Sequence, residues 1–322
     1  MASVLKGAMI GCGWFAENHR EAWLRIPGVE IVAAADTQLD RAQRFAARAY
    51  SSAEGLLDRE QLDFVDIATH ATSHLPLVRL AVERKVPTIC QKPIAPDWAS
   101  AVQLVSAAEA AGVRLMIHET WRWQPWYRVA QEMISRGDIG SPIGYGFRFR
   151  RRDGLGDEPY TEQAYFRKEP KLIIHVTLVH HIDTARFLFG EIDSIYAEAS
   201  RRNPRIVGED QAIITLAHKN GVHGWIDGNR FLDPNPNGPA MGDIYQNNER
   251  AWKNVVTAGC FGDSVRATQA HFISCLQDGS PFESDGRSYL GTFATVEAAY
   301  RSVAERREVS LSEILDSGPQ NT

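Results

Sequence analysis

Between residues 4 and about 120, short apolar runs alternate with longer amphipathic segments, and no other feature restricts the fold as strongly. The apolar runs are nearly continuous, which is typical of parallel strands buried on both faces of a sheet. Strands alternating with helices at this spacing require crossover connections between parallel strands. We therefore predict a Rossmann-type α/β domain with a doubly wound parallel sheet over residues 1–122. The predicted strands are 4–10, 29–35, 64–68, 86–90 and 113–118, and the predicted helices are 16–24, 39–47, 74–83 and 98–111.

The pattern changes after residue 123. Asn220 and Gly221 separate two runs of strand character, and this dipeptide favours the tight turn of an antiparallel hairpin. The predicted strands are 143–149, 195–200, 211–218 and 222–229, and the predicted helices are 127–135, 173–189, 264–278 and 286–306. We predict that residues 123–322 form an α+β domain with a mainly antiparallel open sheet, for substrate binding and oligomerisation.

Composition excludes several classes of protein. A net charge of −5 gives no basic footprint for nucleic acid. No apolar run approaches the roughly 18 to 20 residues that a membrane-spanning helix needs. The four cysteines are scattered without a C-x-x-C pair, which argues against a metal or disulfide framework and fits a reducing compartment. No apolar segment precedes the first motif, so we expect no secretory signal and a cytoplasmic protein.

A glycine-rich element follows the first predicted strand and opens the first predicted helix. Its residues are Gly11, Cys12, Gly13, Trp14, Phe15 and Ala16. Gly11 suits a tight turn, Gly13 allows a pyrophosphate to approach the backbone, and the helix N-terminus offers N–H donors. Asp36 ends the second strand, where a carboxylate accepts bonds from ribose hydroxyls and disfavours NADP. The element predicts an NAD site. The alternative is a bare glycine turn with Asp36 capping the next helix.

Three further segments stand beside this element: Asp66-Ile-Ala-Thr69-His70, Ser73-His74 and Cys90-Gln91-Lys92-Pro93. Together they resemble the Gfo/Idh/MocA family of sugar and polyol dehydrogenases. The resemblance runs from residue 4 to about residue 311 and is weak between 230 and 262. Details such as Ile89–Pro93 and Arg202-Asn-Pro204 look closest to the D-apiose dehydrogenase branch of the family.

The resemblance implies two catalytic residues, Lys92 and His180. The Lys92 ammonium suits hydrogen bonding to the reacting hydroxyl, and imidazole suits acceptance of its proton. Two positions depart from the family pattern: Gln91 replaces a glutamate, and Val176 stands where a carboxylate is usual. The remaining predicted cofactor-binding residues are Thr69, His70, His74, Gln91, Lys92 and Arg122. The predicted substrate contacts are Trp121, Trp123, Tyr165, Arg167, Val176 and His181, with packing as the alternative for the tryptophans and for His181.

We therefore expect an NAD-dependent oxidoreductase that oxidises a secondary alcohol or hemiacetal of a sugar, sugar derivative or polyol. Two alternatives remain. One is an NAD-dependent glycoside-cleaving enzyme that oxidises its substrate transiently, and the other is a non-catalytic NAD-binding regulator. The expected partners are a small carbohydrate and a second copy of the chain, since the family resemblance implies a homodimer or homotetramer. Neither a nucleic acid nor a membrane is expected as a partner, and no metal site is expected.

Overall fold

The computed structural model describes residues 4–231, 244–246, 249–252 and 260–317. These residues form two compact units. The described part of the first unit consists of residues 4–123 and 260–290, and that of the second unit consists of 124–231, 244–246, 249–252 and 291–317.

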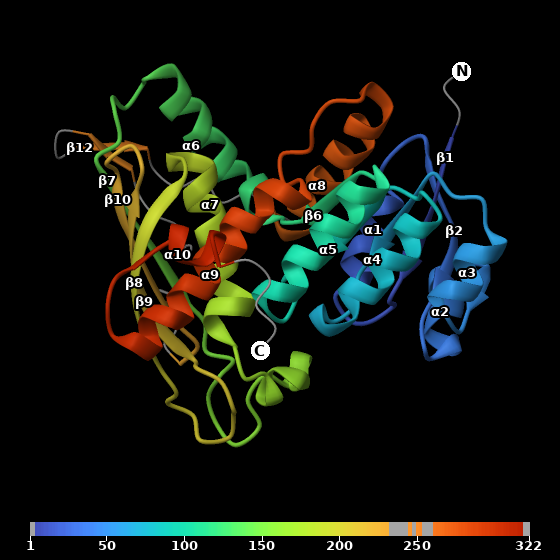
Figure 1. Ribbon diagram of the computed structural model, residues 1–322, viewed down its shortest axis with the longest axis horizontal. Coiled ribbons are helices and arrows are strands. Elements are labelled where there is room, and N and C mark those ends of the chain that lie inside the picture. Colours follow the sequence, from blue (N-terminus) through green and yellow to red (C-terminus); the bar gives the residue numbers. More distant parts are fainter. Residues whose placement is uncertain (1–3, 232–243, 247–248, 253–259, 318–322) are drawn as a thin grey trace. The chain divides into compact units, whose positions relative to one another are not determined.

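The first unit is built on a six-stranded parallel sheet with the order β3-β2-β1-β4-β5-β6 (Figure 1). Every residue of β4 and β5 is buried, as the continuous apolar runs predicted. The doubly wound arrangement expected from the sequence is therefore confirmed. The strands are β1 (Leu5–Ile10), β2 (Val29–Ala35), β3 (Arg48–Tyr50), β4 (Phe64–Ile67), β5 (Thr88–Gln91) and β6 (Leu115–His118).

Helices of the first unit form two packed groups. Helix α4 packs against α3 and α5, and helix α1 packs against α8. The helices are α1 (Ala16–Trp23), α2 (Leu39–Phe45), α3 (Ala53–Arg59), α4 (His74–Glu83), α5 (Trp98–Ala111) and α8 (Cys260–Asp278), with 3₁₀ turns η1 (Ala71–Ser73) and η2 (Trp121–Trp123). Strand β3 and helix α3 were missed by the sequence analysis. The strand has three residues at the sheet edge, too few to show a period, and the helix begins at a cap in which the Ser52 hydroxyl accepts from the Gly55 N–H.

The domain boundary differs from the predicted one in one respect. A contiguous second domain over residues 123–322 was expected, but residues 260–290 cluster with the first unit. Helix α8 explains this assignment, because it packs along α1 and the η2 turn. Arg114, directly before β6, also donates to the carbonyl oxygens of Cys275 and Ser280, which fixes the end of α8 to the parallel sheet.

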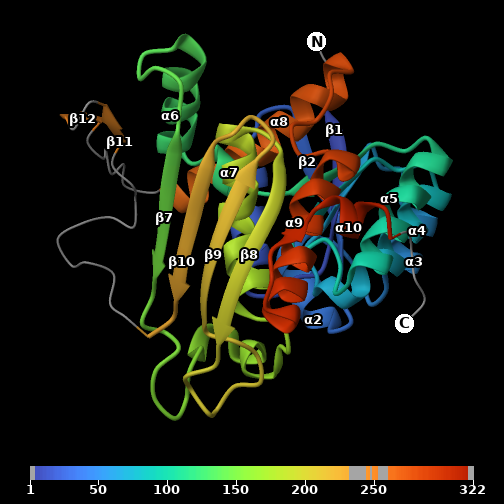
Figure 2. The same ribbon diagram turned by 60° about the vertical axis from the view of Figure 1, so that its left-hand side comes forward.

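The second unit contains a five-stranded sheet with the order β13-β8-β9-β10-β7 (Figure 2). Strands β13, β8, β9 and β10 pair antiparallel, and β7 joins β10 in parallel, so the mainly antiparallel sheet is confirmed. The β9–β10 connection is the predicted hairpin, and Gly221 has a φ of +87° at its turn. The strands are β7 (Gly144–Arg150), β8 (Ile192–Ser200), β9 (Gln211–His218), β10 (His223–Asn229) and β13 (Val309–Ser310).

Helices cover one face of this sheet. The Ser302 hydroxyl of α9 accepts from the backbone N–H of Ala197 in β8 at 2.9 Å, and the η4 turn packs on β9 and β10. The helical segments are α6 (Pro125–Arg136), η3 (Thr161–Lys168), η4 (Ile173–Leu178), α7 (Val179–Phe189), α9 (Gly286–Glu305) and α10 (Ser312–Leu315). Helix α9 begins in the first unit. Strands β11 (Ile244–Gln246) and β12 (Glu249–Trp252) form a separate two-stranded sheet.

Candidate active site

The glycine element lies in the turn from β1 to α1. Gly11 has a φ of +93°, and a Cβ atom there would lie 2.7 Å from the carbonyl oxygen of Ala68. This position therefore requires glycine. At Gly13, by contrast, a Cβ would meet no atom within 4 Å, so the backbone faces open space at the N-terminus of α1. Ala16 begins the helix and is 1% exposed, which keeps α1 close to the sheet. Trp14 is 54% exposed and Phe15 precedes the helix as its N-cap residue.

Asp36 follows the last residue of β2, and its carboxylate is already fixed by two backbone donors. Oδ2 accepts from the N–H of Cys12 and Oδ1 accepts from the N–H of Gln38, each at 2.9 Å. A fixed carboxylate beside a glycine turn that faces open space fits the ribose and pyrophosphate of a dinucleotide. Burial and the Asp36 charge raise the pKa of the Cys12 thiol to about 12, so this cysteine stays a neutral packing residue.

The segment from β4 to the start of α4 holds three predicted cofactor-binding residues: Thr69, His70 and His74. His74 is fully buried at the start of α4, with Nδ1 3.1 Å from the Ile94 carbonyl oxygen and Nε2 3.1 Å from that of Thr69. Burial lowers the pKa of His74 to about 4. Its ring therefore joins the β4 loop to the segment after Pro93, and both ring nitrogens face the protein. The His70 side chain accepts from the Thr72 N–H and caps the η1 turn.

Lys92 lies directly after β5, and the Lys92–Pro93 peptide bond is cis. The positive charge of Lys92 interacts with the carboxylate of Glu119, which is fully buried just beyond β6. Burial raises the pKa of Glu119, and the charges of Lys92 and Arg122 oppose that rise. Glu119 Oε1 also accepts from the Trp121 N–H at 3.0 Å. Lys92 and this buried carboxylate follow strands at the carboxyl edge of the parallel sheet. Parallel sheets bind ligands at that edge.

The predicted contacts around η2 are held within the first unit. Arg122 is 6% exposed and donates through Nη1 to the Glu283 carbonyl oxygen at 2.7 Å. The Trp123 ring lies 4.8 Å from the His271 ring. Trp121 and Trp123 are both partly exposed. Their stacking on a sugar stays a prediction.

His180 lies in the second unit, at the start of α7, after a widened helical turn. The π-helical segment η4 places the Val179 N–H against the Ile174 carbonyl oxygen, five residues back. Such turns occur often at functional sites. His180 is 7% exposed. His181 is 2% exposed, with its ring 5.7 Å from Phe147 and 5.8 Å from Phe149, and burial lowers its pKa to about 3. This geometry favours the packing alternative for His181.

Val176 packs in an apolar cluster of four buried residues: Tyr160, Phe166, Leu172 and Ile206. The neighbouring Thr177 is polar and engaged, because its Oγ1 accepts from Arg230 Nη2 at 2.5 Å. Sequence analysis missed Arg230, which directly follows β10 and looks like an ordinary basic residue in the sequence. Its guanidinium is 4% exposed and donates to Asp153 at 2.7 Å. It also lies 5.3 to 5.5 Å from three aromatic rings, those of Phe149, Tyr160 and Phe166.

The other two predicted substrate contacts lie on η3. Tyr165 is 48% exposed, with its ring packed edge-on against Phe166 at 4.7 Å. Arg167 donates through Nε to the Pro159 carbonyl oxygen at 2.7 Å and pairs with Glu158. Tyr165 therefore presents an accessible ring, and Arg167 is held by its own loop.

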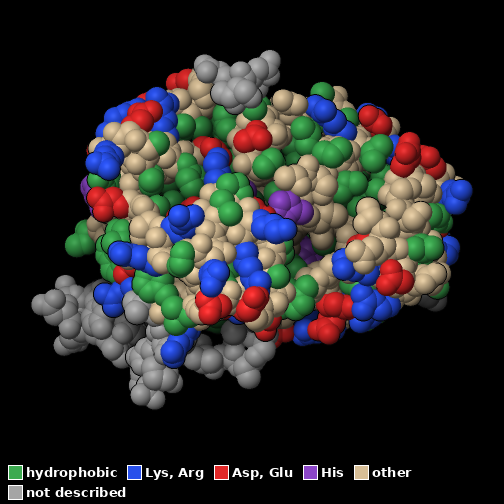
Figure 3. Space-filling view, turned by 90° about the horizontal axis from the view of Figure 1, so that it is seen from below, with side chains coloured by type: hydrophobic (Ala, Val, Ile, Leu, Met, Phe, Trp, Pro, Cys, Tyr) green, Lys and Arg blue, Asp and Glu red, His purple; other side chains and the backbone are tan. Residues whose placement is uncertain are grey.

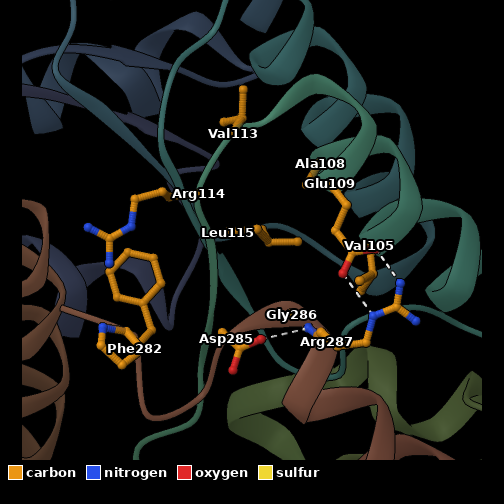
Figure 4. A pocket seen from close by; sticks show the side chains of 11 residues that line it. Val105, Ala108, Glu109, Val113, Arg114, Leu115, Phe282, Asp285, Gly286 and Arg287 are labelled. Atoms are coloured by element: carbon orange, nitrogen blue, oxygen red, sulfur yellow. Dashed lines mark hydrogen bonds and ion pairs between the residues drawn. The ribbon is translucent and has the colours of Figure 1, made fainter. Parts of the chain in front are cut away.

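Each unit also has a hollow of its own. In the first unit, a cavity of about 220 Å³ is lined by α5, β6 and residues 281–287 (Figure 4). Two of its basic side chains are engaged within the unit, since Arg287 donates to Glu109 and the Arg114 guanidinium stacks on the Phe282 ring at 4.1 Å. In the second unit, a larger hollow of about 660 Å³ is lined by residues 154–157, 202–205, Asp210 and Phe231.

Basic and acidic side chains are mixed on the face shown in Figure 3. Over the described residues, none of the helices combines the length and apolarity needed to cross a bilayer.

Models of known protein families match both units. A model of the oxidoreductase family with an NAD-binding Rossmann fold matches residues 5–119. A model of the GFO/IDH/MocA C-terminal domain matches residues 127–243. The chain belongs to the Gfo/Idh/MocA family. It is an NAD-dependent oxidoreductase, as the glycine element and Asp36 predicted.

Members of the family with similar sequences are known. The D-apiose dehydrogenase of Paraburkholderia graminis is 37% identical, over 98% of this chain and 92% of that protein. The D-apiose dehydrogenase of Rhizobium rhizogenes is 34% identical, over 97% of this chain and 99% of that protein. An oxidoreductase from Agrobacterium radiobacter, solved with NAD⁺, L-tartaric acid and magnesium, is 33% identical with a TM-score of 0.84, over 97% of this chain and 100% of that one.

Proposed function

We propose that this Gfo/Idh/MocA protein oxidises a secondary alcohol or hemiacetal of a sugar, sugar derivative or polyol, with a D-apiose-like branched pentose as the first candidate. The observation that carries the proposal is the position of Lys92, which follows β5 at the ligand-binding edge of the sheet. Its ammonium interacts there with the carboxylate of the buried Glu119, which has the opposite charge. The resemblance to two D-apiose dehydrogenases over nearly the full chain supports the substrate class.

In the proposed mechanism, bound NAD supplies the hydride acceptor. The Lys92 ammonium donates a hydrogen bond to the reacting hydroxyl and stabilises negative charge that develops on its oxygen. His180 accepts the hydroxyl proton, which requires a neutral imidazole. Asp36 binds the ribose hydroxyls with a carboxylate that Cys12 and Gln38 already orient.

A screen for NADH formation tests the proposal. D-apiose, aldopentoses, aldohexoses, inositols and sugar lactones are offered with NAD at pH 7 to 9, and formation of NADH with at least one of them is expected. A glycoside offered in the same screen and cleaved without net NADH would point instead to transient oxidation. Binding of NAD without either reaction would point to a regulator.

Substitution of the two catalytic residues tests their roles. Lys92→Ala and His180→Ala should each lower kcat by roughly 100-fold or more and leave the Kd for NAD nearly unchanged. Lys219→Ala in the β9–β10 turn and His223→Ala on β10 are matched controls, since both side chains are exposed. A loss of less than about threefold at Lys92 or His180 would remove that residue from the mechanism.

We also propose that the protein is a cytoplasmic homodimer or homotetramer that associates through the sheet of the second unit. Large apolar side chains on β8, β9 and β10 support this: Tyr196, Ile213 and Trp225 are 36%, 46% and 37% exposed. Exposed apolar patches of this kind favour association. Light scattering should give a multiple of the chain mass, and Ile213→Lys should reduce it to a single chain.

A further inference from the structure

A chain of buried polar groups in the first unit leads from the middle of the parallel sheet to Lys92. Its members are His19 of α1 and Asp66 of β4, both fully buried, and Gln91 at the end of β5, which is 7% exposed. The proposed mechanism uses none of them. Buried polar groups of this kind are destabilising unless they are paired, so the arrangement needs an explanation.

The contacts along the chain are short and continuous. His19 Nδ1 lies 2.8 Å from Asp66 Oδ2, which also accepts from Trp23 Nε1 at 2.7 Å. On the other side of the ring, His19 Nε2 lies 2.8 Å from Gln91 Nε2. Gln91 Oε1 then accepts from the backbone N–H of Lys92 at 2.7 Å.

These contacts determine which nitrogen of the His19 ring carries the proton. The Gln91 oxygen accepts from the Lys92 N–H, so the Gln91 amide group that faces His19 is the NH₂, which can only donate. His19 Nε2 must therefore accept, and the ring proton lies on Nδ1 and is donated to Asp66. A neutral His19 is thus matched to a glutamine at position 91. A carboxylate in that place would face a nitrogen lone pair.

Among the described residues, the charged group that contacts the His19 ring directly is Asp66. The titratable groups that face the ring are Asp66 from β4 and His118 from β6, whose ring stacks on His19 at 4.0 Å. Phe15 contacts the ring edge, and Gln269 of α8 donates to the His19 carbonyl oxygen, but neither titrates. Cys90, which lies near Asp66, has a thiol pKa raised far above its usual range by burial and so stays neutral.

We propose that Asp66, His19 and Gln91 are positioning residues that hold the Lys92 peptide, and with it the direction of the Lys92 ammonium, for the dehydrogenase reaction. The proposal rests on the proposed function of Lys92. It explains why the family glutamate is replaced here by Gln91, since the neutral amide both donates to His19 and accepts from Lys92. Gln91 would then act through Lys92 rather than on the cofactor.

Two variants of one residue test the proposal. Gln91→Met keeps the volume but removes both hydrogen bonds, so kcat should fall about tenfold or more at every pH, with the Kd for NAD within about twofold. Gln91→Glu restores an acceptor for the Lys92 N–H but needs a donor at His19 Nε2, so His19 should take up a proton. Its kcat relative to wild type should be near one at pH 6 and should fall as pH rises and that proton leaves. Gln131→Glu, on α6, makes the same change of charge at a site where Gln131 bonds only Ser135 among the described residues. This control should neither lower kcat nor change its dependence on pH.

Nitrogen-15 NMR of the His19 ring provides a readout that does not depend on activity. The wild-type ring should be neutral with its proton on Nδ1, and the ring in Gln91→Glu should be doubly protonated near pH 6. A His19 that is protonated in the wild type or neutral in Gln91→Glu at pH 6 would overturn the hydrogen-bonded chain. Wild-type kcat in both Gln91 variants would overturn its positioning role. Failure of Lys92→Ala to lower kcat would refute the proposed function of Lys92 by itself, with the NMR result unaffected.

Discussion

Replacement of Asp36 by alanine should change cofactor preference more than any other single substitution in the first unit. The wild-type carboxylate is held by the N–H groups of Cys12 and Gln38 before a ribose arrives, so its binding requires little further ordering. Hydrogen bonds to a charged acceptor contribute about 1.5 to 3 kcal/mol each. A 2′-phosphate placed roughly 5 Å from the carboxylate is repelled by about 3 kcal/mol per unit charge at an effective dielectric constant near 20.

These terms predict that wild type binds NADH at least about 10-fold more tightly than NADPH, which corresponds to about 1.4 kcal/mol. Asp36→Ala should weaken NADH binding by about 10-fold or more and bring the two affinities within about threefold of each other. Fluorescence titration of both reduced cofactors at constant ionic strength measures this. Asp40→Ala, in the exposed first turn of α2, is the control because it removes the same charge nearby. Equal wild-type affinities, or the same effect from Asp40→Ala, would refute the assignment of Asp36.

Three further predictions concern the second unit and pH. Val176→Asp buries a carboxylate among Tyr160, Phe166, Leu172 and Ile206, so it should lower the free energy of unfolding by several kcal/mol in chemical denaturation. It should not raise kcat on the native substrate. A tenfold increase in kcat would indicate an enzyme that has lost a catalytic carboxylate by decay. Thr177→Val leaves a buried Arg230 N–H without its acceptor and should cost about 2 kcal/mol, more than the control Thr295→Val, whose hydroxyl bonds only within α9. His74 and His181 are neutral in the fold, with pKa values lowered to about 4 and about 3, and gain protons on unfolding below about pH 6.5. Unfolding free energy should therefore fall as pH drops from about 6.5 toward 4, and His181→Leu should reduce that slope.

Much of the first unit follows from its sequence because its strands are buried on both faces. The runs 29–35, 74–83 and 98–111 were predicted with the boundaries that the structure has. The glycine turn was also predictable, since Gly11 must adopt a positive φ and Gly13 faces open space. The position of α8 with this unit was not predictable, because its contacts with α1 join residues far apart in the chain.

The polar pairs that support the site escaped prediction for the same reason. His19 and Asp66 are 47 residues apart, and Thr177 and Arg230 are 53 apart. One signal was present: Asp66 interrupts the otherwise apolar strand Phe64–Ile67, and a carboxylate in such a place must have a buried partner. The π-helical turn left no signal. Its residues are apolar almost all round, so no period distinguishes it from an α-helix.

The two departures from the family pattern are matched by their surroundings, and this bears on whether the chain is an enzyme. At position 91, the amide finds one acceptor and one donor within 2.8 Å, where a carboxylate would oppose a neutral histidine. At position 176, the valine lies in an apolar cluster, and the nearby buried charge of Arg230 is balanced by Asp153 and bonded to Thr177. A site that had merely lost its function would be expected to leave buried partners of the lost groups unpaired, because no selection would remove them. The fit at positions 91 and 176 therefore favours a working enzyme over a dehydrogenase that has become a regulator.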